Sequence, residues 1–241
     1  MIRLRSLVTL AAVAIALPVS LTVHDTQAAA QAKAPLPQDP PAVSLFDGKT
    51  LDGWRGYKKE DATGSRWAVA DGTLTLPAGN ARAAGDIITR ETFDLFDLTW
   101  EWKIAQGGNS GLKYFVVEDG NSAIGHEYQL IDDERHPDAK IGPHRQTAAF
   151  YDVLQAHDRP IKPAGEWNAS EVIVRGMHVE HILNGKNVLE YDLDSPALSA
   201  AIAKSKFKDV ARFGKPQNGH ILVQDHGDQV WYRKIEIQRI K

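Results

Sequence analysis

Two polar side chains lie in the middle of a segment that otherwise has the pattern of a β-strand. In residues 125–133, alternation with period 2 puts Glu127 and Gln129 on one face and His126 and Tyr128 on the other. Glutamate is depleted in strands and costly to bury without a partner. We therefore expect Glu127 either on a solvated sheet face or in a polar cleft, where its carboxylate could accept or deliver a proton.

A second strand-like segment, residues 99–104, carries charge in the same way. Its tryptophans face one side, and Glu101 and Lys103 face the other. If this segment lies in one sheet with the first, these two side chains converge with Glu127 and Gln129 on a concave face. The alternative is that the charged side chains only cover a solvated face.

A third polar group follows the apolar run near the C-terminus. In residues 220–227, Gln224 and His226 share a face and Asp225 lies between them. A single histidine usually has a structural role as a hydrogen-bonded residue. Next to a glutamine and an aspartate at the end of a strand, His226 is also a candidate for acid–base work.

Asn109 and Ser110 lie in the glycine-rich stretch 107–111, which indicates a hairpin loop that could also present polar groups at the mouth of a pocket. The histidines also allow a metal site, although no ligand spacing is specific enough to assign one. Those considered are His126, His136, His144, His181 and His226.

Several classes of protein are excluded by what the chain lacks. There is no cysteine among its 241 residues, so it has no disulfide, thiolate zinc site or iron–sulfur cluster. The motifs of α/β serine hydrolases, P-loop NTPases, zincins and dinucleotide-binding proteins are absent from the sequence. A net charge of −3 gives no basic surface for nucleic acid.

These side chains must be positioned by strands, because the chain consists of short β-type runs separated by turn residues. Asp-Gly at 71–72 and Asn-Gly at 184–185 are hairpin signals, and residues 171–192 have the pattern of a three-stranded meander. In the last run, we expect Trp231, Ile235 and Ile237 to share a face. The one predicted helix spans residues 195–206, with Ser195 as N-cap followed by proline. The pattern favours an all-β sandwich or barrel.

The N-terminal 30 residues have the layout of a secretory signal peptide. A basic start precedes the apolar run Leu7–Leu21, and alanines near Ala30 offer cleavage sites. A membrane anchor is the alternative, but the apolar run is shorter than the ~20 residues needed to cross a bilayer. We expect export to the periplasm without stable membrane insertion, a flexible leader at 31–42, and a single domain at 43–241.

Seven segments, taken in order, resemble the 3-keto-disaccharide hydrolase family, also described as 3-keto-glucoside 1,2-lyase/3-keto-2-hydroxyglucal hydratase domains. The resemblance covers Val43 to Ile240. The segments are Leu45–Trp54, Gly108–Gly111, Glu127–Asp132, Ala148–Asp152, Gly165–Asn168, Leu183–Gly185 and Gly219–Gly227. It implies a concanavalin A-like jelly roll of two antiparallel sheets, with a carbohydrate site on its concave face.

The resemblance also implies a chemistry that differs from ordinary glycoside hydrolysis. A ketone at C3 makes the C2 proton of a sugar acidic, so a base can remove it and the aglycone can leave from C1. Glu127 or His226 is then the base and the other the acid, with Lys103, Asn109 and Gln224 as donors to oxygens of the sugar. Further candidates that would orient or bind are Glu101, Ser110, Gln129, Tyr151 and Asp225. No cofactor is required, and a divalent metal is allowed without named ligands.

Two alternatives remain open at this point. The same fold hosts carbohydrate-binding modules that do no chemistry, so fold alone does not decide the function. A conventional glycosidase would instead need two carboxylates about 5–9.5 Å apart. Glu101 with Glu127 is the pair that the sequence offers for that role.

Overall fold

The computed structural model describes residues 39–79 and 85–241. The predicted signal peptide and residues 31–38 of the predicted leader lie outside the described residues. The last part of that leader is hydrogen-bonded to the C-terminal end of the domain. Pro40 O accepts from the Gln238 side chain, and the Asp39 carboxylate accepts from the Lys241 backbone.

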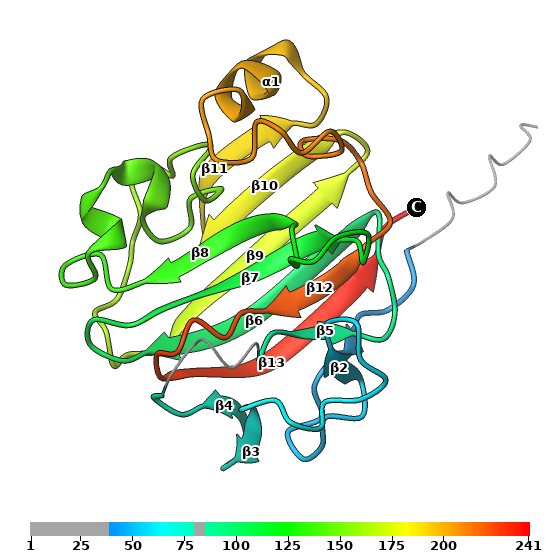
Figure 1. The fold of residues 1–241 in the computed structure, drawn as a ribbon, viewed down its shortest axis with the longest axis vertical. Helices are drawn as coiled ribbons and strands as arrows, with labels where there is room; N and C mark the ends of the chain where they lie inside the picture. Colours follow the sequence, from blue (N-terminus) through cyan, green and yellow to red (C-terminus); the bar gives the residue numbers. More distant parts are fainter. Residues whose placement is uncertain (1–38, 80–84) are drawn as a thin grey trace, which may run out of the picture. The chain divides into compact units, whose positions relative to one another are not determined.

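Two antiparallel sheets form the domain, which confirms the predicted jelly-roll sandwich (Figure 1). The first sheet has the order β11 (Lys186–Asp192), β10 (His178–Leu183), β9 (Asn168–Arg175), β6 (Phe96–Ile104), β13 (Val230–Arg239), β4 (Thr73–Leu76) and β3 (Ala68–Ala70), and β1 (Val43–Ser44) also pairs with β13. The second has the order β2 (Trp54–Gly56), β5 (Ile87–Thr89), β12 (His220–Val223), β7 (Asn109–Val116) and β8 (His126–Ile131).

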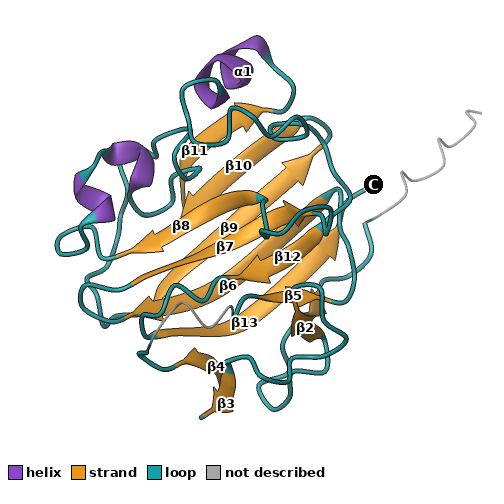
Figure 2. Ribbon diagram, viewed as in Figure 1, coloured by secondary structure: helices purple, strands orange, loops and turns teal. Residues whose placement is uncertain are grey.

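In residues 39–79 and 85–241, the helices are short and lie outside the sheets (Figure 2). The helix α1 (Pro196–Ile202) begins as predicted, because the Ser195 side chain accepts from Leu198 N at 3.2 Å. It ends at Ile202, earlier than the predicted Lys206. The 3-10 helices η2 (Asp138–Lys140) and η3 (Pro143–Arg145) lie in the segment after β8. No helix among the described residues is long and apolar enough to cross a membrane.

The hydrophobic core lies between the two sheets and follows the predicted alternation. Along β6, buried and partly buried residues alternate, with Trp100 and Trp102 almost fully buried. Trp100 meets Tyr128 of the opposite sheet edge to face, with ring centroids 5.0 Å apart. The predicted meander is also confirmed as β9, β10 and β11.

One predicted face on β13 is wrong, because the strand contains a bulge. Trp231 points away from the core, whereas Ile235 and Ile237 point into it. The pairing of β13 with β6 shifts between Arg233 and Glu236, and Lys234 adopts a positive φ of 50°. An extra residue in one strand inverts the alternation beyond it, which a simple period-2 pattern does not anticipate.

A chain of hydrogen bonds crosses the core between the loop after α1 and the loop after η3. Gly214 N donates to His126 Nε2 at 3.0 Å, and His126 Nδ1 lies 3.0 Å from the Tyr191 hydroxyl. The chain continues through the hydroxyls of Tyr191 and Tyr114 to His181 Nε2, and His181 Nδ1 reaches Ala148 O at 2.8 Å.

The two ends of this chain determine its direction. Gly214 N can only donate, so His126 Nε2 accepts and its ring proton is on Nδ1, which donates to Tyr191. Ala148 O can only accept, so His181 Nδ1 donates to it. The two tyrosine hydroxyls then donate in the same direction, toward His181 Nε2, and both imidazoles are neutral. Burial, the main cause, lowers the pKa of His126 to about 3 and that of His181 to about 4.

Candidate functional site

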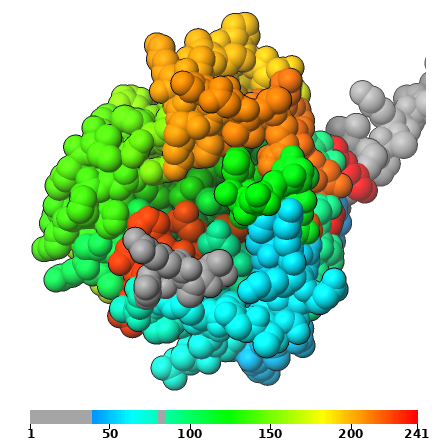
Figure 3. Space-filling view, viewed as in Figure 1, coloured from blue at the N-terminus to red at the C-terminus, as the bar shows by residue number. Residues whose placement is uncertain are grey.

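A cavity of about 690 Å³ opens on the outer face of the five-stranded sheet, the face turned away from the core (Figure 3). Strands β7 and β8 and the end of β12 form its floor, and loops before β5, after β2, before β8 and after α1 form its walls. Its charged lining residues are Lys58, Lys59, Asp86, Lys113, Glu127, Lys206 and Asp225.

Glu127 is a buried acid of this cavity, so of the two expected places, a solvated sheet face or a polar cleft, it lies in the cleft. Its side chain lies over Gly111 of the neighbouring strand, where a Cβ atom would overlap Glu127 Oε1. Burial raises the pKa of Glu127, and the ammonium groups of Lys113 and Lys206 oppose that rise. A carboxylate whose pKa is raised in this way is a stronger base than a free one, which suits it to take a proton from a ligand.

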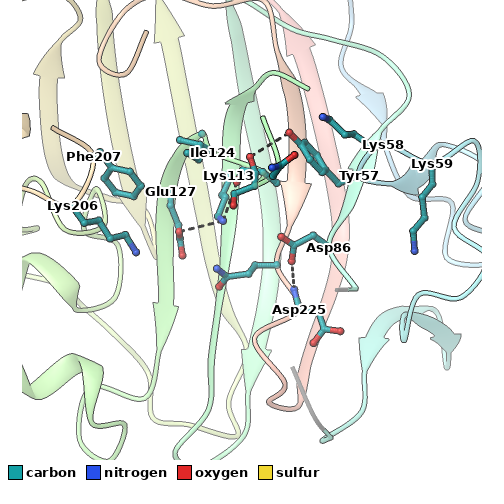
Figure 4. Close-up of a pocket in the computed structure, with 15 residues that line it drawn as sticks. Tyr57, Lys58, Lys59, Asp86, Lys113, Ile124, Glu127, Lys206, Phe207 and Asp225 are labelled. Atoms are coloured by element: carbon teal, nitrogen blue, oxygen red, sulfur yellow. Dashed lines mark hydrogen bonds and ion pairs between the residues drawn. The ribbon is translucent and has the colours of Figure 1, made fainter. Parts of the chain in front are cut away.

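The two lysines approach Glu127 from opposite sides (Figure 4). Lys113 comes from β7, and its Nζ is 3.7 Å from Glu127 Oε2. Lys206 comes from the loop after α1, and its Nζ lies 4.2 Å from the centroid of the Tyr151 ring. Burial is the main cause that lowers the pKa of Lys206, and Glu127 opposes this effect. Two ammonium groups beside one carboxylate can stabilise negative charge that develops on a bound ligand.

Neither lysine was identified from the sequence. The sequence could have indicated Lys113 as a site residue, because it is a charged residue within a strand-like run, as Glu127 is. No sequence pattern indicates Lys206. Its position depends on the loop after α1, where its backbone N donates to Asp152 Oδ2 at 2.7 Å.

Gln224 and Asp225 line the opposite side of the cavity with Asp86. Asp225 N donates to Asp86 Oδ1 at 2.8 Å, and Asp225 Oδ1 accepts from Arg66 Nη1 at 2.8 Å. Burial is the main cause that raises the pKa of Asp225, and Arg66 opposes it. In the described part of the chain, the buried Oε1 of Gln224 has no hydrogen-bond partner. This acceptor is available to a ligand.

Gln129 and Ser110 lie beneath the cavity and support it. With its amide oriented to donate, Gln129 reaches Ser110 O at 2.9 Å and Glu127 Oε1 at 3.3 Å. The Ser110 hydroxyl donates to Gln224 O at 2.8 Å, and it faces the core, not the mouth of the pocket. Tyr151 lies under Lys206 and donates to Asp138 Oδ2 at 2.8 Å. These residues hold the cavity-lining groups in place.

The predicted convergence of Glu101 and Lys103 with Glu127 is wrong, because β6 and β8 belong to different sheets. Glu101 is paired with Arg233 and Lys234, each at 2.6 Å. Lys103 packs against Trp231, with 4.4 Å between Nζ and the ring centroid. Alternation predicts which side of a strand is polar, but it does not say to which sheet the strand belongs.

His226 and Asn109 lie at one end of the same sheet face and do not line the cavity. Asn109 Nδ2 is 3.4 Å from His226 Nε2, and Asn109 N donates to Asp228 Oδ2 at 2.9 Å. His226 is nevertheless close enough to lower the pKa of Glu127. Among the described residues, His136, His226 and Asp228 also bring three ligand-type atoms within 4.8 Å of one another.

The chain matches one protein family over most of its length. Residues 41–238 match the family model described as a 3-keto-alpha-glucoside-1,2-lyase-like domain. A 3-keto-disaccharide hydrolase of Bacteroides thetaiotaomicron is 38% identical over 225 residues, which are 81% of this chain and 77% of that protein.

Solved structures agree with the fold. A crystal structure of a protein from Parabacteroides distasonis has a TM-score of 0.74 at 29% identity, covering 83% of this chain and 94% of that one. The β-glucanase of Bacillus licheniformis has a TM-score of 0.50 at 9% identity, covering 85% of this chain and 100% of that one, and it shares the fold alone. The matched model and the identity to its relative show that this chain belongs to the family of 3-keto-α-glucoside-1,2-lyase-like domains.

Proposed function

We propose that the protein cleaves 3-keto-glycosides, including 3-keto-disaccharides, by elimination followed by hydration. A base removes the proton from C2, and the electron pair is delocalised onto the C3 ketone oxygen as an enolate. The enolate collapses to form the C1–C2 double bond while the bond from C1 to the glycosidic oxygen breaks, and the departing oxygen takes up a proton. Water then adds its hydroxyl to C1 and a proton to C2, so the net reaction is hydrolysis.

Glu127 is the base in this proposal. It is a buried carboxylate in the cavity, its pKa is raised by burial, and Gln129 holds one of its oxygens. The other buried carboxylate there, Asp225, is paired with Arg66. Lys113 and Lys206 stabilise the enolate oxygen electrostatically, and Lys206, whose pKa is lowered by burial, delivers the proton to the departing oxygen. Phe207 lines the same cavity and offers a ring face to the sugar.

The observation that carries the proposal is the placement of Glu127 between two lysines in a cavity large enough for a sugar substrate. An enolate needs cations near its oxygen and one base near C2, and it needs no second carboxylate as nucleophile. Family membership and the name of the Bacteroides thetaiotaomicron relative support the same substrate class.

The test compares oxidised with unoxidised sugars. We expect turnover of 3-keto-trehalose or 3-keto-sucrose and none of trehalose or sucrose. Glu127→Gln should lower kcat by at least ~100-fold. Glu101→Gln is the matched control, because Glu101 lies on the other sheet, and it should leave kcat unchanged.

Other outcomes would select a different function. Cleavage of unoxidised disaccharides would favour a conventional glycosidase, for which Asp86 or Asp225 would accompany Glu127 in the cavity. Saturable sugar binding without turnover of any of these substrates would favour a carbohydrate-binding module. Undiminished turnover by Glu127→Gln would remove Glu127 from the role of base.

A further inference from the structure

The geometry points to a divalent transition-metal site formed by His136, His226 and Asp228, which we propose as a second functional element of the protein. His136 lies in the segment after β8, and the other two lie in the turn between β12 and β13. His226 Nδ1 is 3.5 Å from Asp228 Oδ2, and His136 Nε2 is 4.0 Å from the same oxygen. The three ligand atoms are therefore clustered around one point from two separate segments.

These short separations suit a shared ion better than direct pairing. Neither imidazole makes a hydrogen bond to the Asp228 carboxylate that meets normal geometry, although both approach it. The two rings meet edge to face, with centroids 5.6 Å apart. Both rings direct one nitrogen toward the carboxylate, which brings three ligand-type atoms within 4.8 Å of one another.

Neighbouring groups hold two of the three ligands. Asn109 N donates to Asp228 Oδ2 at 2.9 Å, which restricts the carboxylate. The Asn109 amide lies 3.4 Å from His226 Nε2. With Nδ1 on the metal, His226 Nε2 carries the ring proton, and the amide can turn to accept it, as the second shell of a metal site commonly does.

One contact opposes metal binding. His136 Nδ1 accepts the Asp138 backbone N–H at 3.1 Å, so the neutral ring carries its proton on Nε2 in the metal-free protein. Binding through Nε2 moves that proton to Nδ1 and breaks this hydrogen bond. We therefore expect weaker affinity than in a preformed site.

The ligand set indicates which metals fit. Two imidazoles and one carboxylate favour Zn²⁺, Co²⁺ or Ni²⁺ over Mg²⁺ or Ca²⁺, and three protein ligands leave coordination positions for oxygens of a substrate. Asn109 is two residues from Gly111 along β7, about 7 Å. Because Glu127 lies over Gly111, the metal would stand roughly one sugar ring from the base. Coordination of a sugar oxygen by the metal rests on the proposed function, whereas the metal site itself does not.

The test measures binding without substrate. Chelator-treated full-length protein is titrated with ZnCl₂ by calorimetry and with CoCl₂ by visible absorption. We expect one ion per chain with a Kd in the micromolar range, and a cobalt spectrum that shows nitrogen ligation. Asp228→Asn and His136→Gln should each weaken binding by more than the ~10- to 100-fold typical of losing a second-shell partner.

The matched control is His178→Gln. His178 also stands beside two carboxylates, Glu190 and Asp192, but on the other sheet, so this variant should bind as the wild type does. Absence of saturable binding, or equal binding by wild type, Asp228→Asn and His136→Gln, would overturn the proposal. Binding with no turnover of 3-keto-sugars would leave the metal site standing and remove the proposed reaction.

Discussion

The buried histidines predict a steep loss of stability in mild acid. His126 and His181 are fully enclosed and neutral in the folded protein, with pKa values of about 3 and about 4 against 6.5 for a free imidazole. When pH falls below 6.5 the unfolded chain takes up protons that the folded chain does not. The stabilisation is therefore complete above pH 6.5 and is lost progressively as pH falls toward 4 and then 3.

The size of the effect follows from these values. Between pH 7 and pH 5, each histidine removes about 2 kcal/mol from the free energy of unfolding, and the pair removes about 4 kcal/mol. A typical domain has about 5–15 kcal/mol in total. The two imidazoles alone should therefore remove between about a quarter and about four fifths of such a total by pH 5.

Urea unfolding followed by tryptophan fluorescence at pH 7, 6 and 5 measures this loss. His181→Gln replaces the imidazole with a neutral amide that can still donate and accept. The variant should be less stable at pH 7, but its loss between pH 7 and pH 5 should be smaller by about 2 kcal/mol.

The exposed His157 supplies the control, and His157→Gln should keep the wild-type pH dependence. If His181→Gln loses as much stability as the wild type between pH 7 and pH 5, the reasoning fails. A buried imidazole would then be titrating at an ordinary pKa.

Three further predictions concern the cavity and the N-terminus. Lys206→Met removes a charge that lowers the pKa of Glu127, so this pKa should rise in the variant. The fall of kcat/KM at low pH should therefore begin at a higher pH than in the wild type, and an unchanged pH profile would contradict this. Gly111→Ala places a Cβ against Glu127 Oε1 and should cost ~10-fold or more in kcat without loss of fold by circular dichroism; full activity would show that Glu127 can move. Protein secreted by an expressing bacterium should begin near Gln31 by mass spectrometry, and an intact Met1 would exclude cleavage.

The fold could be predicted because its signals are local. Alternation along residues 99–104 and the Asn-Gly turn at 184–185 correspond directly to β6 and to the turn between β10 and β11. The prediction for Trp231 was wrong because β13 contains one extra residue at Lys234. Lys234 has a positive φ, a conformation that a glycine often indicates in a sequence, but the residue here is lysine. Local patterns are reliable until the register changes.

The site was only partly predictable because it is assembled from distant segments. Glu127 could be identified as a polar residue within a strand, and Gln224 and Asp225 as polar residues just after one, and both strands belong to the five-stranded sheet. Glu101 has the same local pattern but belongs to the other sheet. The chain passes from one sheet to the other between β6 and β7, and a local sequence pattern does not show this change. Lys206 reaches Glu127 from a loop, where no periodicity exists to mark it.

The residues that line the cavity come partly from strands and partly from loops, and these two groups differ in how freely they can change. Glu127 and Lys113 lie directly opposite each other in paired strands, so the register of the sheet sets their positions. Lys58 and Lys59 are exposed on the loop after β2. Under the proposed function, substitutions in this loop can alter which sugar or aglycone is accepted while Glu127, Lys113 and Lys206 stay in place. New specificities should therefore arise by exchanging loops on an unchanged pair of strands.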